Sequence, residues 1–439
     1  MVADLSNTIE ITSIDNEGRG IGHLNEKIIF VDNALINETV RFRILKKKKN
    51  ILFARSEEVL KESTQRVAPI CKVYGICGGC SMQHFEISTQ LAYKQRAFED
   101  TLKHVGKVKP ETILSAISGP LDSYRHKARF RVKFVKKKNK VLIGFNEKKS
   151  HFLTDMEMCA VVPIKISMLL KPLQLLFNTL SIKDKIPQIE YASNQKRHIM
   201  VVRILEELSD VDIKSLKLFQ DFHKIEFWTQ TKGYDTIKPL VNEMDTEIIY
   251  SNIEFDLHFF FQPTSFTQIN PFINLVLIRR AMALLQPKKD ELIVDFFAGL
   301  GNFTLPIATF GSSVIGVEGD DALVESGHKN ATRNNLSKNV NFIKIDLFNA
   351  KQEDIKLLGK ADKWLIDPPR DGALNLVNLI NADIQPKKIV YISCNPATLA
   401  RDANILINEK GYNFTKSGIL NMFPHTSHVE SISLFELNE

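Results

Sequence analysis

Cysteine is scarce in this sequence, and long hydrophobic runs are missing. Five cysteines among 439 residues are too few and too unevenly placed for a disulfide-stapled secreted protein. No stretch approaches about 18 uncharged apolar residues, and the opening MVADLSNTIE lacks the basic-then-apolar layout of a signal peptide. We therefore expect a cytoplasmic protein without a membrane partner.

The overall composition is ordinary for a globular protein, with 44% hydrophobic and 25% charged residues. At roughly 150 residues per domain, the length predicts two or three domains. The net charge of 58 − 51 = +7 is only mildly basic. The position of the charge therefore says more about partners than its sum does.

Positive charge is concentrated in residues 121–150, which carry eleven Lys or Arg and two acids, a local excess of +9. Five of these cations recur at every second position, the period of a β-strand with one charged face: Arg125, Lys127, Arg129, Arg131 and Lys133. A charged face is usually just solvated, but natural surfaces intersperse charges of both signs. A polyanion partner explains this strand better, and a second basic run at residues 41–49 supports that interpretation.

Three regions with different patterns follow one another along the chain. Residues 1–65 contain short strand-like pieces separated by turn residues, which is typical of a small β-barrel. Residues 66–260 hold three clustered cysteines, a helical stretch near 86–105 and the basic strand, and we expect an α+β domain there. In residues 261–439 near-continuous apolar strands alternate with helices, which predicts an α/β domain with a doubly wound parallel sheet.

Ligands of such sheets bind outside the carboxyl ends of the strands. Four acids stand at four consecutive predicted strand ends: Asp295, Glu318, Asp346 and Asp367. The first strand runs into a glycine turn at residues 297–304, a place where backbone approaches a ligand closely. Glu318 follows about twenty residues later, where a carboxylate accepts hydrogen bonds from ribose hydroxyls. Because Thr304 replaces the third glycine of the dinucleotide motif, the spacing resembles class I S-adenosylmethionine-dependent methyltransferases more than dehydrogenases.

Two further residues suggest covalent chemistry. Cys394 closes the next predicted strand, and Asn395 and Pro396 suit the cap and first position of a helix. The helix dipole stabilises a thiolate at that place, so Cys394 is either a nucleophile or a small buried hydrophobe. Strand alternation puts Glu430 on one face with the apolar Ile432. A carboxylate there is costly unless it is functional, so Glu430 is either a general base with a raised pKa or a residue at the solvent edge.

Five motifs together resemble the RNA 5-methyluridine methyltransferase family: FFQPTSFTQIN (260–270), DFFAGLGNFT (295–304), DPPRDG (367–372), SCNPATLARD (393–402) and HTSHVES (425–431). The resemblance covers most of the chain. The N-terminal region resembles the TRAM RNA-binding module. Barrel, cysteine cluster and methyltransferase in this order resemble the branch that methylates uridine 1939 of 23S rRNA, whereas relatives acting on tRNA are expected to lack both barrel and cluster.

The resemblance implies a mechanism and the residues that perform it. Cys394 is then the nucleophile that attacks C6 of uracil, and Glu430 is the base that removes the C5 proton after methyl transfer. S-adenosyl-L-methionine is the implied methyl donor, with contacts from Gln268, Phe297, Asn302, Glu318, Asp346 and Asp367. Asp346 stands where some relatives have asparagine, and either residue accepts a hydrogen bond from an adenine amine.

The other four cysteines predict a metal site. Cys71, Cys77 and Cys80 form C-x5-C-x2-C in a glycine-rich turn, and Cys159 lies far downstream. Four thiolates suit either structural zinc or an iron–sulfur cluster, and the single cysteine doublet favours the cluster, because zinc sites more often use two. The resemblance implies a [4Fe–4S] cluster with a structural role, and the C-x3-C-x2-C spacing usual for a radical methyltransferase is absent.

We therefore predict a monomeric three-part enzyme that methylates C5 of one uridine in 23S rRNA. The base must be unstacked or flipped to expose C5 and C6. One alternative is the same chemistry on another RNA, either a second 23S uridine or the tRNA T-loop. The other is a cluster-containing RNA-binding or assembly factor with a vestigial cofactor fold, and the presence of both Cys394 and Glu430 argues against it.

Overall fold

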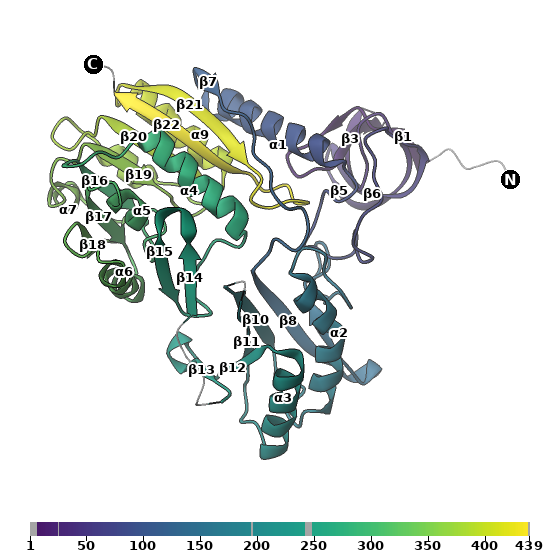
Figure 1. The fold of residues 1–439 in the computed structure, drawn as a ribbon. Helices are drawn as coiled ribbons and strands as arrows, with labels where there is room; N and C mark the ends of the chain where they lie inside the picture. The colour runs from purple at the N-terminus through teal and green to yellow at the C-terminus, as the bar shows by residue number, and fades with distance from the viewer. Residues whose placement is uncertain (1–6, 25, 195, 242–247, 438–439) are drawn as a thin grey trace.

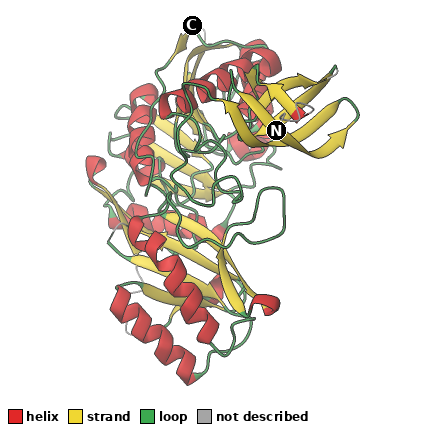
Figure 2. Ribbon diagram, turned by 90° about the vertical axis from the view of Figure 1, so that its right-hand side faces the viewer, coloured by secondary structure: helices red, strands yellow, loops and turns green. Residues whose placement is uncertain are grey.

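The structure is a computed structural model that describes residues 7–24, 26–194, 196–241 and 248–437. The strands of these residues form four sheets, which Figure 1 shows as an N-terminal sheet, a central sheet, a hairpin and a large C-terminal sheet. Figure 2 shows the same parts from the side, with the helices of the central part packed on one face of its sheet.

The N-terminal sheet has six short strands in the order β1-β5-β6-β4-β3-β2. It curls around an apolar core that includes Ile11, Ile29 and Val40. The short strands predicted in residues 1–65 are present. The closure of this sheet into a barrel stays a prediction. The bounds are β1 (Thr8–Glu10), β2 (Ser13–Ile14), β3 (Gly20–Leu24), β4 (Lys27–Asp32), β5 (Thr39–Lys48) and β6 (Ile51–Lys61).

The segment after this sheet leads through the cysteine-rich turn into α1 (Ile87–Thr101), which a π-helical turn, η2 (Leu102–Gly106), extends. The helix predicted near 86–105 is therefore confirmed. The Glu86 side chain caps its start by accepting the N–H groups of Ser88 and Thr89. Phe98 is buried in the core of the C-terminal sheet, so the helix packs on that domain, and β7 (Thr112–Ile113) pairs with its edge.

The central sheet has the order β13-β12-β11-β10-β8-β9. Helices α2 (Ile164–Thr179) and α3 (Asp210–His223) cover one of its faces, as Figure 2 shows. The strands are β8 (Lys127–Val135), β9 (Lys140–Gly144), β10 (Gln188–Ser193), β11 (His198–Arg203), β12 (Glu226–Gln230) and β13 (Lys238–Pro239), and short 3-10 turns are η3 (Lys136–Lys138), η4 (Tyr234–Thr236) and η5 (Ile253–Phe255).

The predicted period of two is confirmed in β8. Phe130 and Val132 are buried under the helices, whereas Arg129, Arg131 and Lys133 are exposed on the opposite face. The strand starts at Lys127. Arg125, which the period of two placed on the strand, lies in the preceding loop of residues 121–126. The basic residues therefore lie on a face of the sheet that the helices leave uncovered.

A two-stranded hairpin, β14 (Ile248–Asn252) and β15 (Leu257–Phe261), comes before α4 (Pro271–Leu285) and the C-terminal sheet. The hairpin packs against the core of the C-terminal domain through Ile248 and Phe259. The division of the chain into residues 1–65, 66–260 and 261–439 stays a prediction. Three elements of residues 66–260, namely α1, β7 and this hairpin, pack on the C-terminal sheet.

The C-terminal sheet has the order β18-β17-β16-β19-β20-β22-β21-β7, and the five strands from β18 to β20 are parallel. All five predicted strands are confirmed. Helices lie on both faces (Figure 1), which is the doubly wound arrangement. The strands are β16 (Leu292–Phe296), β17 (Ser313–Glu318), β18 (Val340–Lys344), β19 (Lys363–Ile366), β20 (Lys388–Ser393), β21 (Tyr412–Leu420) and β22 (Glu430–Leu437), and the helices are α5 (Thr304–Ala308), α6 (Asp321–Arg333), α7 (Gln352–Lys356), α8 (Leu374–Leu379) and α9 (Pro396–Asn408).

Strand β22 runs antiparallel to β20, so its first residue lies at the edge where the parallel strands end. The acids, the glycine turn and Cys394 belong to this same edge. Among the described residues, no helix has the length and apolar character needed to cross a membrane.

Candidate active site

Cys394 and Glu430 lie close together at the ends of two adjacent strands. Ser393, the last residue of β20, pairs with Ser431 of β22; Cys394 directly follows β20, and Glu430 is the first residue of β22. The Glu430 carboxyl is close enough to raise the pKa of the Cys394 thiol. Cys394 is partly exposed in a cavity of about 410 Å³ that Asn395 and His428 also line; we call it the nucleophile pocket.

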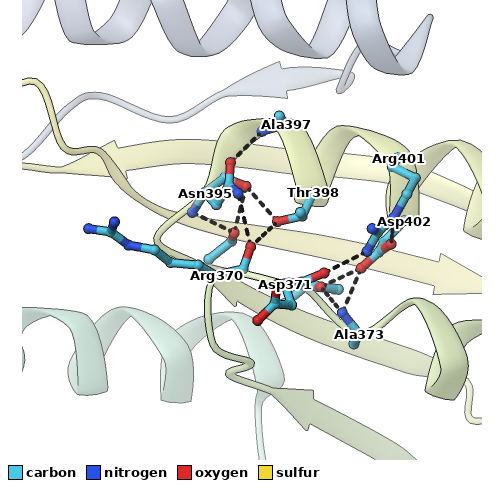
Figure 3. Close-up of polar contacts among 10 residues, drawn as sticks. Arg370, Asp371, Ala373, Asn395, Ala397, Thr398, Arg401 and Asp402 are labelled. Carbon is cyan, nitrogen blue, oxygen red and sulfur yellow. Dashed lines mark hydrogen bonds and ion pairs between the residues drawn. The ribbon is translucent and has the colours of Figure 1, made fainter. Parts of the chain in front are cut away.

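The loop that follows Cys394 is clamped to the loop after β19, as Figure 3 shows. Asn395 caps α9 by accepting the N–H of Ala397 at 3.1 Å, and Pro396 occupies the first turn, so the predicted cap is confirmed. The Asn395 amide donates to the Arg370 carbonyl at 2.9 Å, and the Thr398 hydroxyl donates to the same carbonyl. These bonds fix the position of Arg370 relative to Cys394.

The electrostatics of Cys394 differ from the expectation of a helix-stabilised thiolate. Burial and, to a smaller extent, the carboxyls of Glu430 and Asp367 raise the pKa of the Cys394 thiol to about 11, although the Arg370 guanidinium lowers it. The expected stabilised thiolate was therefore wrong for the resting protein. The physical reason is that burial of the sulfur, with two carboxyls nearby, outweighs the helix dipole.

Three acids at the carboxyl edge share raised pKa values. Glu430 is only 3% exposed, and burial together with Asp367 raises its pKa well above the usual range. Burial raises the pKa of Asp367 to about 7. Burial also raises the pKa of Asp295 to about 8, partly offset by Thr304, whose hydroxyl donates to it. The solvent-edge alternative for Glu430 is wrong, and its raised pKa fits the predicted base.

The glycine turn leaves space for a ligand. Phe297, Gly299 and Gly301 all have positive φ angles, of 64°, 56° and 99°. A Cβ placed on Gly299 would meet nothing within 4 Å, so the space above this backbone is open. The Gly299 N–H donates to the Glu318 carboxylate at 2.9 Å, which joins the turn to the end of β17.

Four of the six predicted cofactor contacts line one cavity, which we call the cofactor cavity: Gln268, Phe297, Asn302 and Asp367. The other two lie outside it. Glu318 stands at the end of β17 against Gly299, and Asp346 is exposed and accepts hydrogen bonds from the Phe348 backbone and the Asn349 amide.

Asn274 is a residue that the sequence analysis missed. Its side chain and that of Asn302 exchange two amide hydrogen bonds of 3.0 and 3.1 Å at the wall of the cofactor cavity. A single asparagine within the apolar sequence of α4 was the available signal, because a buried amide needs a partner.

The four remaining cysteines line one cleft, which we call the cysteine cleft: Cys71, Cys77, Cys80 and Cys159. Burial raises the pKa of Cys80 to about 12 and that of Cys159 to about 11. In the described part of the chain, no three His, Cys, Asp or Glu side chains are placed to hold one metal ion.

Arginines of the basic strand region open on the same cleft, namely Arg125, Arg129 and Arg131. Their charge is partly compensated: Arg129 forms an ion pair with Glu190 at 3.2 Å, and Arg131 donates to Asn146 at 2.8 Å. In the second basic run, the two arginines pair with Glu57 and Glu58 on β6, whereas its lysines at positions 46–49 are exposed.

The loop before Glu430 is held by residues from the cysteine segment and α1, which the sequence analysis missed. The backbone N–H groups of Ser81 and Met82 donate to the His425 carbonyl at 2.9 and 3.0 Å. Gln90 accepts the His425 N–H at 3.0 Å, and the buried Lys94 ammonium donates to the Phe423 carbonyl. No local pattern signals contacts between residues more than 300 positions apart.

Comparison with known proteins identifies the family. The model for tRNA (uracil-5-)-methyltransferase matches residues 86–437, which is most of the chain. The chain belongs to this family. The model for the TRAM domain matches residues 7–56, so this family member carries a TRAM domain at its N-terminal sheet.

Curated relatives of this methyltransferase align over nearly the whole chain. A protein of Nitrosospira multiformis named 23S rRNA (uracil(1939)-C(5))-methyltransferase RlmD is 46% identical over 97% of this chain and 97% of its own. The protein of the same name from Azoarcus is 48% identical over 98% of this chain and 99% of its own.

A solved structure has the same fold over almost the entire length. The tRNA (uracil-54, C5)-methyltransferase of Pyrococcus abyssi, in complex with S-adenosyl-L-homocysteine, covers 98% of this chain and 100% of its own, with a TM-score of 0.73 and 22% identity. Because so nearly complete a match includes the N-terminal sheet, the expectation that tRNA enzymes of this family lack this region was wrong. Domain order therefore does not decide the RNA substrate.

Proposed function

We propose that this methyltransferase transfers a methyl group from S-adenosyl-L-methionine to C5 of uridine 1939 in 23S rRNA. The observation that carries the chemistry is the pairing of Ser393 with Ser431, which brings Cys394 close to the buried Glu430. The choice of RNA rests on the two relatives at 46% and 48% identity over nearly the whole chain. Because the proposed substrate is ribosomal RNA, we place the reaction in the cytoplasm. One chain supplies both reacting groups, Cys394 and Glu430.

The two residues divide a reaction that uracil C5 does not undergo alone. Cys394 first releases its thiol proton to solvent. Its thiolate then adds to C6, and the electron pair of the C5–C6 double bond moves toward the C4 carbonyl, which makes C5 nucleophilic. Once C5 is methylated, Glu430 accepts the C5 proton. The C5–C6 double bond then re-forms, the C6–S bond breaks, and Cys394 leaves as thiolate. A base with a raised pKa suits this proton transfer.

The residues of the cofactor cavity fit S-adenosyl-L-methionine, which supplies the methyl group when bound. The open space above Gly299 is a cradle that any larger residue would fill. We assign contacts to Gln268, Phe297, Asn302, Glu318, Asp346 and Asp367. Burial raises the pKa values of Asp295 and Asp367 at this edge, and a sulfonium cation bound beside them would favour their charged forms.

We propose that the cysteine cleft holds a [4Fe–4S] cluster through Cys71, Cys77, Cys80 and Cys159. A cluster of this kind is held by four cysteine thiolates, and all four of these thiols line one cleft. The single cysteine doublet favours a cluster over zinc, because zinc sites more often use two. The role of the cluster is structural: it holds Ser81 and Met82 against the loop that leads to Glu430.

The RNA is expected to lie along the cysteine cleft and into the nucleophile pocket. Arg370 and His428 line both cavities, so the two adjoin. The arginines of the cleft attract the phosphates, and the target uridine leaves its stack to reach Cys394.

A trapping experiment tests this function. Wild-type protein incubated with the donor and a 5-fluorouridine 23S rRNA fragment should give a covalent complex, because fluorine at C5 blocks release. Cys394→Ala should give none, whereas Glu430→Gln should retain an adduct with the natural RNA and lose turnover by about 10²–10⁴-fold.

The same experiment with different RNAs separates the alternative substrates and the alternative function. Methylation of a tRNA transcript in place of the 23S fragment would transfer the same chemistry to another substrate. A wild-type protein that fails to trap either RNA would favour a non-catalytic RNA-binding or assembly factor.

A further inference from the structure

Two polar side chains from outside the parallel sheet line the cofactor cavity. His126 directly precedes the basic strand β8 of the central sheet, and Tyr250 belongs to β14 of the hairpin. Neither residue is part of a motif that the family resemblance uses. The cofactor cavity is therefore walled by three separate parts of the molecule.

Both side chains place a buried polar atom there without a partner. The Nδ1 atom of His126 and the hydroxyl of Tyr250 have no hydrogen-bond partner among the described residues. The Asn274 side chain lies near the Tyr250 hydroxyl and lowers its pKa as a hydrogen-bond partner does, but both ends of its amide already bond with Asn302. Buried polar atoms are rarely left unpaired, because each costs free energy relative to its hydrated state. Two such atoms in one cavity indicate a polar ligand.

The surroundings hold His126 in place and keep it neutral. Its backbone N–H donates to the Ile269 carbonyl at 2.8 Å, and its ring packs edge-on against Phe272. Burial and the neighbouring His198 lower the pKa of His126 to about 4. A neutral imidazole offers one acceptor and one donor nitrogen, and a tyrosine hydroxyl does both.

The cavity corresponds to one end of the proposed cofactor. Glu318, at the strand end where a carboxylate binds ribose, lies outside it, as does Asp346. The part of the ligand that enters beside Gln268, Asn302 and Asp367 is therefore the amino-acid end, which carries an ammonium and a carboxylate.

We propose that His126 and Tyr250 bind the amino-acid end of S-adenosyl-L-methionine, so that the cofactor joins the central sheet and the hairpin to the C-terminal domain. This inference rests on the proposed function. It assigns cofactor binding to two residues that lie outside the parallel-sheet domain.

Calorimetric titration of the full chain with two ligands tests this proposal. S-adenosyl-L-homocysteine carries the amino-acid end, and 5′-methylthioadenosine lacks it. Tyr250→Phe, which removes only the hydroxyl, should weaken S-adenosyl-L-homocysteine about tenfold and leave 5′-methylthioadenosine unchanged. His126→Ala should also weaken the binding of S-adenosyl-L-homocysteine, and His126→Asn should recover part of the lost affinity. Tyr234→Phe, at an exposed tyrosine, is the matched control.

The outcomes separate the two proposals. Wild-type protein that binds neither ligand would contradict the proposed use of the cofactor. Tyr250→Phe that binds both ligands as tightly as wild type, or loses affinity for both equally, would overturn the inference and leave the function intact.

Discussion

The five cysteines of this methyltransferase occupy two adjoining but different environments. Four thiols share the cysteine cleft, where burial dominates and other thiols add to the rise in the pKa of Cys80. Cys394 stands alone in the nucleophile pocket, where two carboxyls raise its pKa and Arg370 lowers it. Arg370 and His428 line both cavities.

The difference shows what each site needs to become reactive. Thiols that raise one another's pKa lose their protons together when a metal cluster binds them, since a coordinating thiol is deprotonated outright. A single thiol beside two carboxyls needs a positive charge nearby, which Arg370 provides. Burial alone therefore does not distinguish a metal ligand from a nucleophile, and the neighbours do.

Removal of one cysteine from each site gives the largest expected contrast. Cys394→Ser should lower methylation at least about 10³-fold and leave the iron content unchanged. Cys80→Ser should lose iron and lower the Tm by more than about 4 °C, because metal binding contributes directly to folding. Iron analysis, thermal melting and methyl transfer measure the three effects. A Cys80→Ser protein that keeps its iron would break the comparison.

The arginines of the cysteine cleft should affect RNA binding next most strongly. Arg129→Ala combined with Arg131→Ala should reduce the slope of log affinity against log salt by about 1.4–1.8 and weaken binding about tenfold or more at low salt. Lys214→Ala with Lys217→Ala, on α3 at the opposite face of the central sheet, is the control. Equal slopes for both double variants would remove the basic strand from the interface.

Replacement of Arg370 should give the smallest but most specific effect, which is visible in the pH dependence of the reaction. The reactive form of Cys394 is the thiolate, so kcat/KM should rise about tenfold per pH unit from pH 7 to 9, below a pKa of about 11. Arg370→Met removes the charge that lowers this pKa, so its profile should shift to higher pH, with a loss of about 3–10-fold at neutral pH. Arg370→Lys should retain the wild-type profile. A uniform loss at all pH values would show that Arg370 acts only in binding.

Much of the catalytic domain was predictable because its signals are local. Apolar runs alternating with helices predicted β16 to β20, and the cap residues Asn395 and Pro396 predicted the start of α9. The period of two predicted the exposed arginines of β8. Each of these depends on neighbours within a few residues, which a sequence displays directly.

The contacts that define the site could not be predicted from the sequence. The pKa of Cys394 depends on Glu430 and Asp367, which approach only after β20 and β22 pair. Asn274, His126 and Tyr250 enter the cofactor cavity from three different elements. The pairing of the two arginines of the second basic run with Glu57 and Glu58 requires the register between β5 and β6.

By itself, the order of residues determined the parallel sheet, the acids at its carboxyl edge and the residue types for covalent chemistry, because these follow from periodicity and side-chain identity. Only the tertiary structure decided that Cys394 rests as a buried thiol and that four distant cysteines share one cleft with arginines. It also decided that the central sheet contributes to the cofactor cavity. The reason is that burial, charge–charge distance and strand register arise from segments that meet only when the chain folds.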